Sequence, residues 1–243
     1  MKAKAIGTVM AVMFLAANAV VAQPIILDGG FENESIQISW PHTYYRWGGD
    51  VASIIPAESG ITPRGGTKML KFGLSGWDTR NLPNAVASQV VHLVDVRAYA
   101  DYIAAGEAVA TFSAYFNRVA GDAQTDTAFE VRIKAYSGPT SQHTSKREAG
   151  EWLDRVVGDT LTDGDVSTWE WGTTAPMTLP AGTDYLAVEV VALENIYNDG
   201  LTDEFDGHYA DDAFLTVTPE PATLFVMMAA GLPVLLKRRR RRS

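Results

Sequence analysis

The 243-residue sequence contains no cysteine and only four histidines. The absence of cysteine excludes a disulfide scaffold, thiol catalysis and zinc sites built on cysteine. The histidines are scattered without metal-ligand spacing, and there is no Gly-x-Ser-x-Gly elbow, phosphate-binding glycine loop or His-Glu-x-x-His motif. We therefore predict a protein without catalytic residues.

Charge is distributed unevenly along the chain. The net charge is −9, but residues 1–22 and 222–243 carry no acidic residue. Residues 23–221 hold 12 basic and 29 acidic residues, a net charge of −17. Such a body repels phosphate backbones, so we expect no nucleic-acid partner. The hydrophobic content of 47% is high enough for a folded core and excludes a wholly disordered chain.

Residues 1–22 have the pattern of a secretory signal peptide. Lys2 and Lys4 precede an apolar segment over 6–17, and small residues follow at Ala19 and Ala22. This order predicts export, with cleavage after Ala19 or after Ala22. The alternative is that the apolar segment forms a buried first helix of the fold.

The last 26 residues, 218–243, have a different pattern. Residues 222–236 are 15 uncharged residues that six basic residues, 237–242, follow directly. As a helix this segment would span about 22 Å, less than the roughly 30 Å of bilayer hydrocarbon. The basic cluster stops transfer and stays in the cytoplasm, which predicts a membrane helix with the acidic body outside.

The motif Pro219-Glu220-Pro221, the apolar segment and the terminal arginines together resemble the PEP-CTERM sorting tail. The resemblance implies recognition by an exosortase-type membrane enzyme, and a location on the outer surface or in an exopolysaccharide matrix. A plain C-terminal anchor that nothing cleaves is the alternative.

Residues 23–217 read as one β-rich domain. Short runs of β-branched and aromatic residues are separated by Gly, Asp, Asn and Pro. They predict strands near 24–27, 35–40, 51–55, 67–73, 86–93, 107–117, 127–136, 151–157, 168–173, 183–193 and 208–217. One helix is expected after Asp95, with Val96, Tyr99 and Ile103 as its apolar stripe and Gly106 at its end. The prediction is all-β: an antiparallel β-sandwich (jelly roll) with one short helix.

Several motifs resemble galactose-binding-type jelly rolls and their carbohydrate-binding modules. They are the opening segment 27–32, the turn and strand 65–72, the pair 87–91 and 110–116, and the closing strand 209–215. The resemblance implies a structural calcium ion between the first and last strands. Glu32 and Asp211 match its carboxylates, with Asp212 as the alternative to Asp211, and carbonyls of 65–68 could complete the site. Solvated or capping acids are the competing interpretation.

Sugar binding needs exposed aromatic faces beside polar groups. The densest aromatic cluster spans 42–47 and contains Tyr44, Tyr45 and Trp47, and Trp77 and Tyr197 are further candidates. These rings could instead cover the ends of the core, as we expect for Trp40, Trp169 and Trp171. The sequence thus predicts an exported, non-catalytic carbohydrate-binding or matrix protein. The alternatives are a purely structural exopolysaccharide-associated protein and, less favoured, a polysaccharide-active enzyme.

Overall fold

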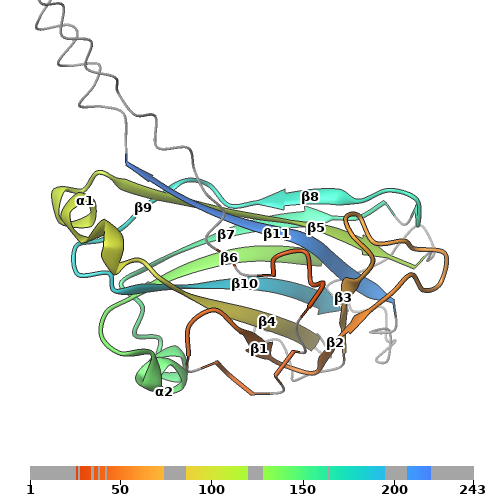
Figure 1. The fold of residues 1–243 in the computed structure, drawn as a ribbon, viewed down its shortest axis with the longest axis horizontal. Coiled ribbons are helices and arrows are strands. Elements are labelled where there is room, and N and C mark those ends of the chain that lie inside the picture. Colours follow the sequence, from red (N-terminus) through yellow and green to blue (C-terminus); the bar gives the residue numbers. More distant parts are fainter. Residues whose placement is uncertain are drawn as a thin grey trace, which may run out of the picture.

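In a computed structural model the chain forms two antiparallel β-sheets that face each other across a shared core. The structure describes residues 26, 28–33, 36–37, 39–41, 43–73, 86–119, 128–163, 165–194 and 207–219. The strands β8, β5 and β11 run side by side in one layer, and β6, β10 and β4 run together in the other (Figure 1).

The first sheet has five strands in the order β1-β4-β10-β6-β7, and the second has the path β2-β3-β11-β5-β8 with β9 paired to β5. The strands are β1 (Trp47–Gly49), β2 (Ala52–Ile55), β3 (Met69–Phe72), β4 (Val86–Asp95), β5 (Ala108–Arg118), β6 (Ala128–Tyr136), β7 (Asp154–Leu161), β8 (Glu170–Thr173), β9 (Met177–Thr178), β10 (Tyr185–Glu194) and β11 (His208–Pro219). The predicted antiparallel β-sandwich is therefore confirmed.

Alternation along the strands builds the core. In β5 the even-numbered residues from Ala108 to Phe116 are completely buried between the sheets, while residues of odd number such as Ser113 and Tyr115 face outward. Phe116 stacks on Phe129 of the opposite sheet with ring centroids 4.9 Å apart. The two sheets are thus joined by aromatic packing, as expected for a domain without disulfides.

The predicted helix forms close to its expected place. Arg97–Tyr99 make a 3₁₀ turn, and α1 (Ala100–Ala105) follows and ends at Gly106 with φ 72°. The Asp95 carboxylate accepts a hydrogen bond from the Arg97 N–H at 3.0 Å, but Asp95 is not the N-cap: Val96 and Tyr99 hold the cap positions of the 3₁₀ turn and of α1, without a side-chain cap bond.

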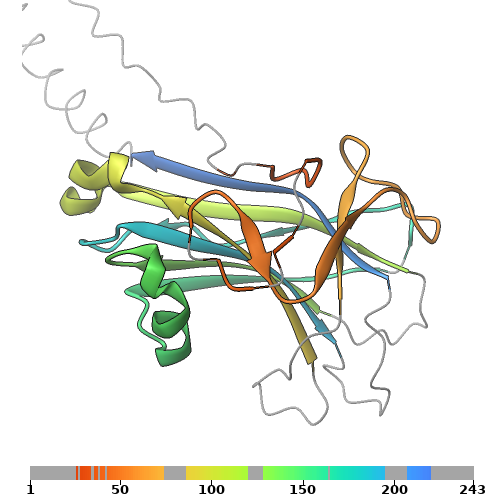
Figure 2. The same ribbon diagram turned by 60° about the horizontal axis from the view of Figure 1, so that its bottom comes forward.

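The prediction of a single helix is wrong. A second 3₁₀ turn (Thr140–Gln142) leads into α2 (His143–Ala149), which lies toward the same end of the sandwich as α1 (Figure 1 and Figure 2). His143, the first residue of α2, is completely buried against the rings of Tyr136 and Tyr185. The α2 helix has only about two turns, too few to show an apolar periodicity in the sequence. Tertiary contacts stabilise such a short helix more than its helix propensity does.

The N-terminal strands also differ from expectation. The segment predicted as a strand over 35–40 contributes one parallel bridge, Gln37 to Gly48, and no strand among its described residues. The strand β1 lies instead at Trp47–Gly49 and pairs with β4. Most of the strand predicted near 24–27 lies outside the described residues.

The last strand reaches the predicted sorting motif. Pro219 is the final residue of β11 and pairs with Ala108, so the strand extends two residues beyond the predicted domain end at Val217. Glu220, Pro221, the apolar segment 222–236 and the predicted signal peptide lie outside the described residues. Within the described ranges, no helix has the length and apolar character needed to cross a membrane.

Candidate functional site

The predicted calcium residues lie around one segment, 64–68, that joins β2 to β3. The Glu32 carboxylate accepts hydrogen bonds from the Thr67 N–H at 2.8 Å, the Lys68 N–H at 3.0 Å and the Thr67 hydroxyl at 2.8 Å. These donors, with the Lys68 N–H first, hold the pKa of Glu32 below its ordinary value. Glu32 therefore fixes one side of the segment as a carboxylate.

Asp211 holds the other side of the same segment. Its Oδ2 accepts the Arg64 N–H at 2.8 Å and the Gly65 N–H at 3.2 Å, and its Oδ1 accepts the Asp212 N–H at 2.7 Å. Asp211 is completely buried, and burial raises its pKa to about 6. We call Glu32, Asp211 and residues 64–68 the carboxylate clasp.

The carboxylate clasp joins the segments that the sequence predicted would share a calcium ion. However, all four carboxylate oxygens of Glu32 and Asp211 already accept hydrogen bonds. Among the described residues, no three acidic or histidine side chains converge as metal ligands. Calcium prefers six to eight oxygen ligands. The arrangement suits a hydrogen-bonded clasp better than a metal cage, and calcium here stays a prediction.

Asp212 lies at the edge of the clasp, where its carboxylate is beside Gly65. It has φ 48°, and the pairing of β11 with β5 shifts in register between Asp211 and Phe214. This bulge buries Asp211 and turns Asp212 outward, where it forms an ion pair with Arg64. The Arg64 guanidinium in turn lies 3.5 Å from the ring centre of Tyr115. The alternative ligand role of Asp212 stays a prediction, and its carboxylate also borders an open surface.

That surface is a shallow hollow of about 470 Å³ on the outer face of the second sheet. It crosses β8, β5 and β11. Trp171 of β8 pairs with Tyr115 of β5, and Phe214 of β11 pairs with Ser113 of β5. Trp171 is 57% exposed and Phe214 40% exposed. We call this surface the aromatic hollow; it is lined by Ile26, Gly29, Gly30, Arg64, Ser113, Tyr115, Trp171, Asp212, Ala213 and Phe214.

The aromatic hollow contains both kinds of contact that a sugar needs. Since the Arg64 guanidinium covers the Tyr115 ring, the rings of Trp171 and Phe214 are the open apolar faces. They stand on strands that flank β5 and are offset by two residues along it, so their backbones are about 12 Å apart. The Arg64–Asp212 pair supplies donors and acceptors between them.

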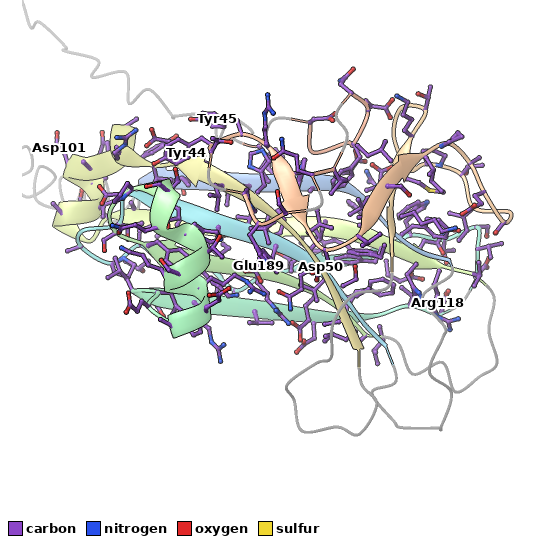
Figure 3. The ribbon with its side chains drawn as sticks, turned by 90° about the horizontal axis from the view of Figure 1, so that it is seen from below. Tyr44, Tyr45, Asp50, Asp101, Arg118 and Glu189 are labelled. Atoms are coloured by element: carbon purple, nitrogen blue, oxygen red, sulfur yellow. The ribbon has the colours of Figure 1, made fainter. Side chains whose placement is uncertain are left out.

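The predicted aromatic cluster at 42–47 lies elsewhere, against the first sheet. Tyr44 packs on Tyr185, and Tyr45 lies beside Tyr44 with ring centroids 5.9 Å apart (Figure 3). Tyr45 is 37% exposed, whereas Trp47 is completely buried and donates from Nε1 to the Asp28 carbonyl. The Trp47 ring belongs to the core, so its prediction as a sugar contact is wrong. Trp77 and Tyr197 lie outside the described residues.

Sequence reasoning assigned Trp171 to the end of the core and overlooked Phe214, Tyr115 and Arg64. The strand pattern did contain a signal, because buried residues of even number in β5 place Ser113 and Tyr115 on the outer face. No pattern revealed that β8 would lie beside β5, or that a bulge would turn Asp212 outward.

Comparisons with known proteins add limited information. No family model matches this chain, and no curated protein matches it. Among solved structures, it is similar to the enzymatically active domain of tailspike protein 4 from bacteriophage CBA120, with 6% identity and a TM-score of 0.39 over 69% of this chain and 18% of that one. It is also similar to the CBM22-2 xylan-binding domain of Paenibacillus barcinonensis Xyn10C, with 15% identity and a TM-score of 0.39 over 69% of this chain and 87% of that one. Likenesses this distant carry no argument about the ligand.

Proposed function

We propose that the protein is a non-catalytic carbohydrate-binding protein and that the aromatic hollow is its binding surface. The observation that carries the proposal is the exposed Trp171 on the outer face of a sheet, beside Phe214 and the Arg64–Asp212 pair. Exposing the apolar ring of a tryptophan to water is unfavourable. Packing of the ring on the C–H face of a pyranose would remove this apolar surface from water.

The shape of the surface favours a chain over a single sugar. The hollow is open, and the backbones that carry its two exposed rings are about 12 Å apart, a span wider than one pyranose ring. A polysaccharide could contact both rings while its hydroxyl groups bond to Arg64 and Asp212. We therefore propose a polysaccharide as the partner.

The acidic residue at the aromatic hollow favours binding of a polysaccharide without its hydrolysis. Most glycoside hydrolases place two carboxyl groups on opposite sides of the scissile bond. Among the described residues that line the aromatic hollow, Asp212 is the single acidic one, and it is ion-paired with Arg64. We propose no reaction at this surface.

The sequences of the two chain ends support a proposal about where the protein is located. We propose export through the signal-like residues 1–22, and sorting to the outer surface or matrix through the PEP-CTERM-like tail 218–243 by an exosortase-type enzyme. Mass spectrometry of the mature N- and C-termini from the native cell tests both steps, and intact termini on a cytosolic product would reject them.

A glycan array probed with the full chain and with Trp171→Ala tests the binding surface. We expect Trp171→Ala to weaken retention at least about tenfold, because one stacked ring is lost. Tyr102→Ala is the matched control, since Tyr102 is an exposed ring on α1 outside the hollow. Unchanged melting temperatures would show that both variants are folded.

Tyr45→Ala separates this surface from the loop that the sequence indicated. If Tyr45→Ala abolishes retention and Trp171→Ala does not, the aromatic hollow is the wrong site. If the unmodified chain retains no glycan at about 1 mM, carbohydrate binding is rejected in favour of a structural matrix role.

A further inference from the structure

The strand β7 is the exposed edge of the first sheet. It pairs with β6 along all eight residues without a register shift, and it is the last strand in the order of that sheet. On its other side no described strand pairs with it. A long, regular edge strand presents backbone groups to which another strand can bind.

The inner side of β7 is closed by its own domain. Val156 packs against the core, and a side chain at Gly158 would overlap the Thr173 carbonyl of the second sheet. The edge and the outer face are therefore the parts of β7 open to a partner.

The outer face of β7 carries a regular pattern of exposed side chains. Val157 is 39% exposed and Leu161 59%, and Leu153, the residue just before β7, is 44% exposed. Exposed charges alternate with them, Arg155 before Val157 and Asp159 after it. We call these five residues the β7 stripe; it reads apolar, positive, apolar, negative, apolar.

This order is self-complementary about Val157. If a second copy lies antiparallel with Val157 opposite Val157, then Leu153 faces Leu161 and Arg155 faces Asp159, twice by symmetry. Directly opposed side chains on antiparallel strands have Cβ atoms about 5 Å apart, close enough for both kinds of pair to interact. A two-fold axis with like surfaces is also the commonest symmetry of protein dimers.

We propose that the chain forms a symmetric dimer in which β7 of one copy pairs antiparallel with β7 of the other, centred on Val157. The first sheets of the two copies then join into one continuous sheet. Each copy brings one aromatic hollow on its second sheet, so the dimer carries two candidate polysaccharide-binding surfaces.

The absence of cysteine gives a direct test on the full chain. Residues opposite each other on antiparallel strands have Cα atoms about 4.5 to 5.5 Å apart, within the range of a disulfide. Val157→Cys should therefore yield a covalent dimer on mild oxidation, reversed by reductant. Ala105→Cys, at an exposed position on α1, is the control and should stay mostly monomeric. Equal cross-linking of the two variants would overturn the proposal.

Charge exchange tests the register. Arg155→Asp places carboxylates opposite each other and should raise the dimer dissociation constant at least about tenfold in analytical ultracentrifugation. The double variant Arg155→Asp/Asp159→Arg should restore dimerisation, because the pairs re-form with opposite sign. Failure of the double variant to recover, or a wild-type chain that is monomeric at about 100 μM, would contradict this dimer. Both dimer measurements are made without glycan, so this test is independent of glycan binding.

Discussion

The Lys134 ammonium lies 2.7 Å from Glu189 Oε1 on the adjacent strand of the first sheet. Glu189 is completely buried, and Lys134 is 6% exposed. Arg132 approaches the other carboxylate oxygen at 3.5 Å. Arg132 is also ion-paired with Glu130 of its own strand, so it is Lys134 that depends on Glu189, which Figure 3 labels, for its compensation.

We predict that Glu189→Ala destabilises the protein by roughly 3–5 kcal/mol, because it leaves Lys134 buried without an opposite charge. Urea unfolding followed by tryptophan fluorescence measures this loss. The paired variant Glu189→Leu/Lys134→Met should retain near wild-type stability, because it removes both buried charges together. A double variant as unstable as Glu189→Ala would show that the ion pair itself supplies the stability.

The large strands of the fold could be predicted because their sequences are locally consistent. The alternation in 127–136 and the runs near 86–93, 107–117 and 208–217 correspond to β6, β4, β5 and β11. The elements that were not predicted, β1 and α2, are short and contact neighbours distant in sequence, β4 for β1 and Tyr185 for α2. Their residues have no periodicity of their own that would indicate structure.

His92 provides a prediction about acid stability. It faces the core, is completely buried and stacks edge-on against Trp47 with ring centroids 5.0 Å apart. Burial lowers its pKa to about 4, although the nearby charge of Asp28 acts in the opposite direction. In the unfolded chain the pKa of a histidine is about 6.5, so between pH 6.5 and 4 the unfolded state binds more protons.

Stability should therefore fall as the pH decreases through that window, by about 3 kcal/mol for this group. His92→Gln, which has no titrating ring, should show a flatter dependence between pH 6.5 and 4. Asp211 has the opposite effect. Its pKa is about 6 in the folded protein and about 4 in the unfolded chain, so the stability of the protein should fall as the pH rises from about 4 to 6. Urea unfolding at several pH values for wild type, His92→Gln and Asp211→Asn separates the two contributions. Identical slopes for wild type and His92→Gln would contradict the assignment.

Gly66 gives a prediction about the carboxylate clasp. It has φ 59°, and an added Cβ would overlap the Glu32 carboxylate. Gly66→Ala should therefore combine backbone strain with displacement of Glu32 and cost roughly 2–4 kcal/mol. Gly106→Ala is a matched control, since Gly106 has φ 72° and no atom within 4 Å of an added Cβ. We expect the control to cost only about 1 kcal/mol in the same thermal or urea unfolding assay.

Equal losses in Gly66→Ala and Gly106→Ala would show that Glu32 does not hold the segment. In the double variant Gly66→Ala/Glu32→Ala the overlap is absent, so its cost should be smaller than the sum of the single variants.

The candidate site was less predictable than the fold. Glu32 and Asp211 were identified because their motifs are local, and the structure brings both to residues 64–68. The aromatic hollow depends instead on two features of the fold. The strand order places Trp171 beside Tyr115, and the bulge before Phe214 turns Asp212 toward the same face. Exposure was also misjudged in both directions, since Trp47 is buried and Trp171 is open.

The calcium prediction can be tested on the same clasp. If an ion binds Glu32 and Asp211, then calcium at about 1 mM should raise the melting temperature, and a chelator in excess should lower it by several degrees. Glu32→Gln should abolish that difference while keeping an acceptor for the Thr67 and Lys68 N–H groups. Asp163→Asn, at an exposed carboxylate outside the clasp, is the control and should keep the full response. A melting temperature that is the same with calcium and with chelator would mean that the hydrogen bonds of Glu32 and Asp211 alone hold residues 64–68.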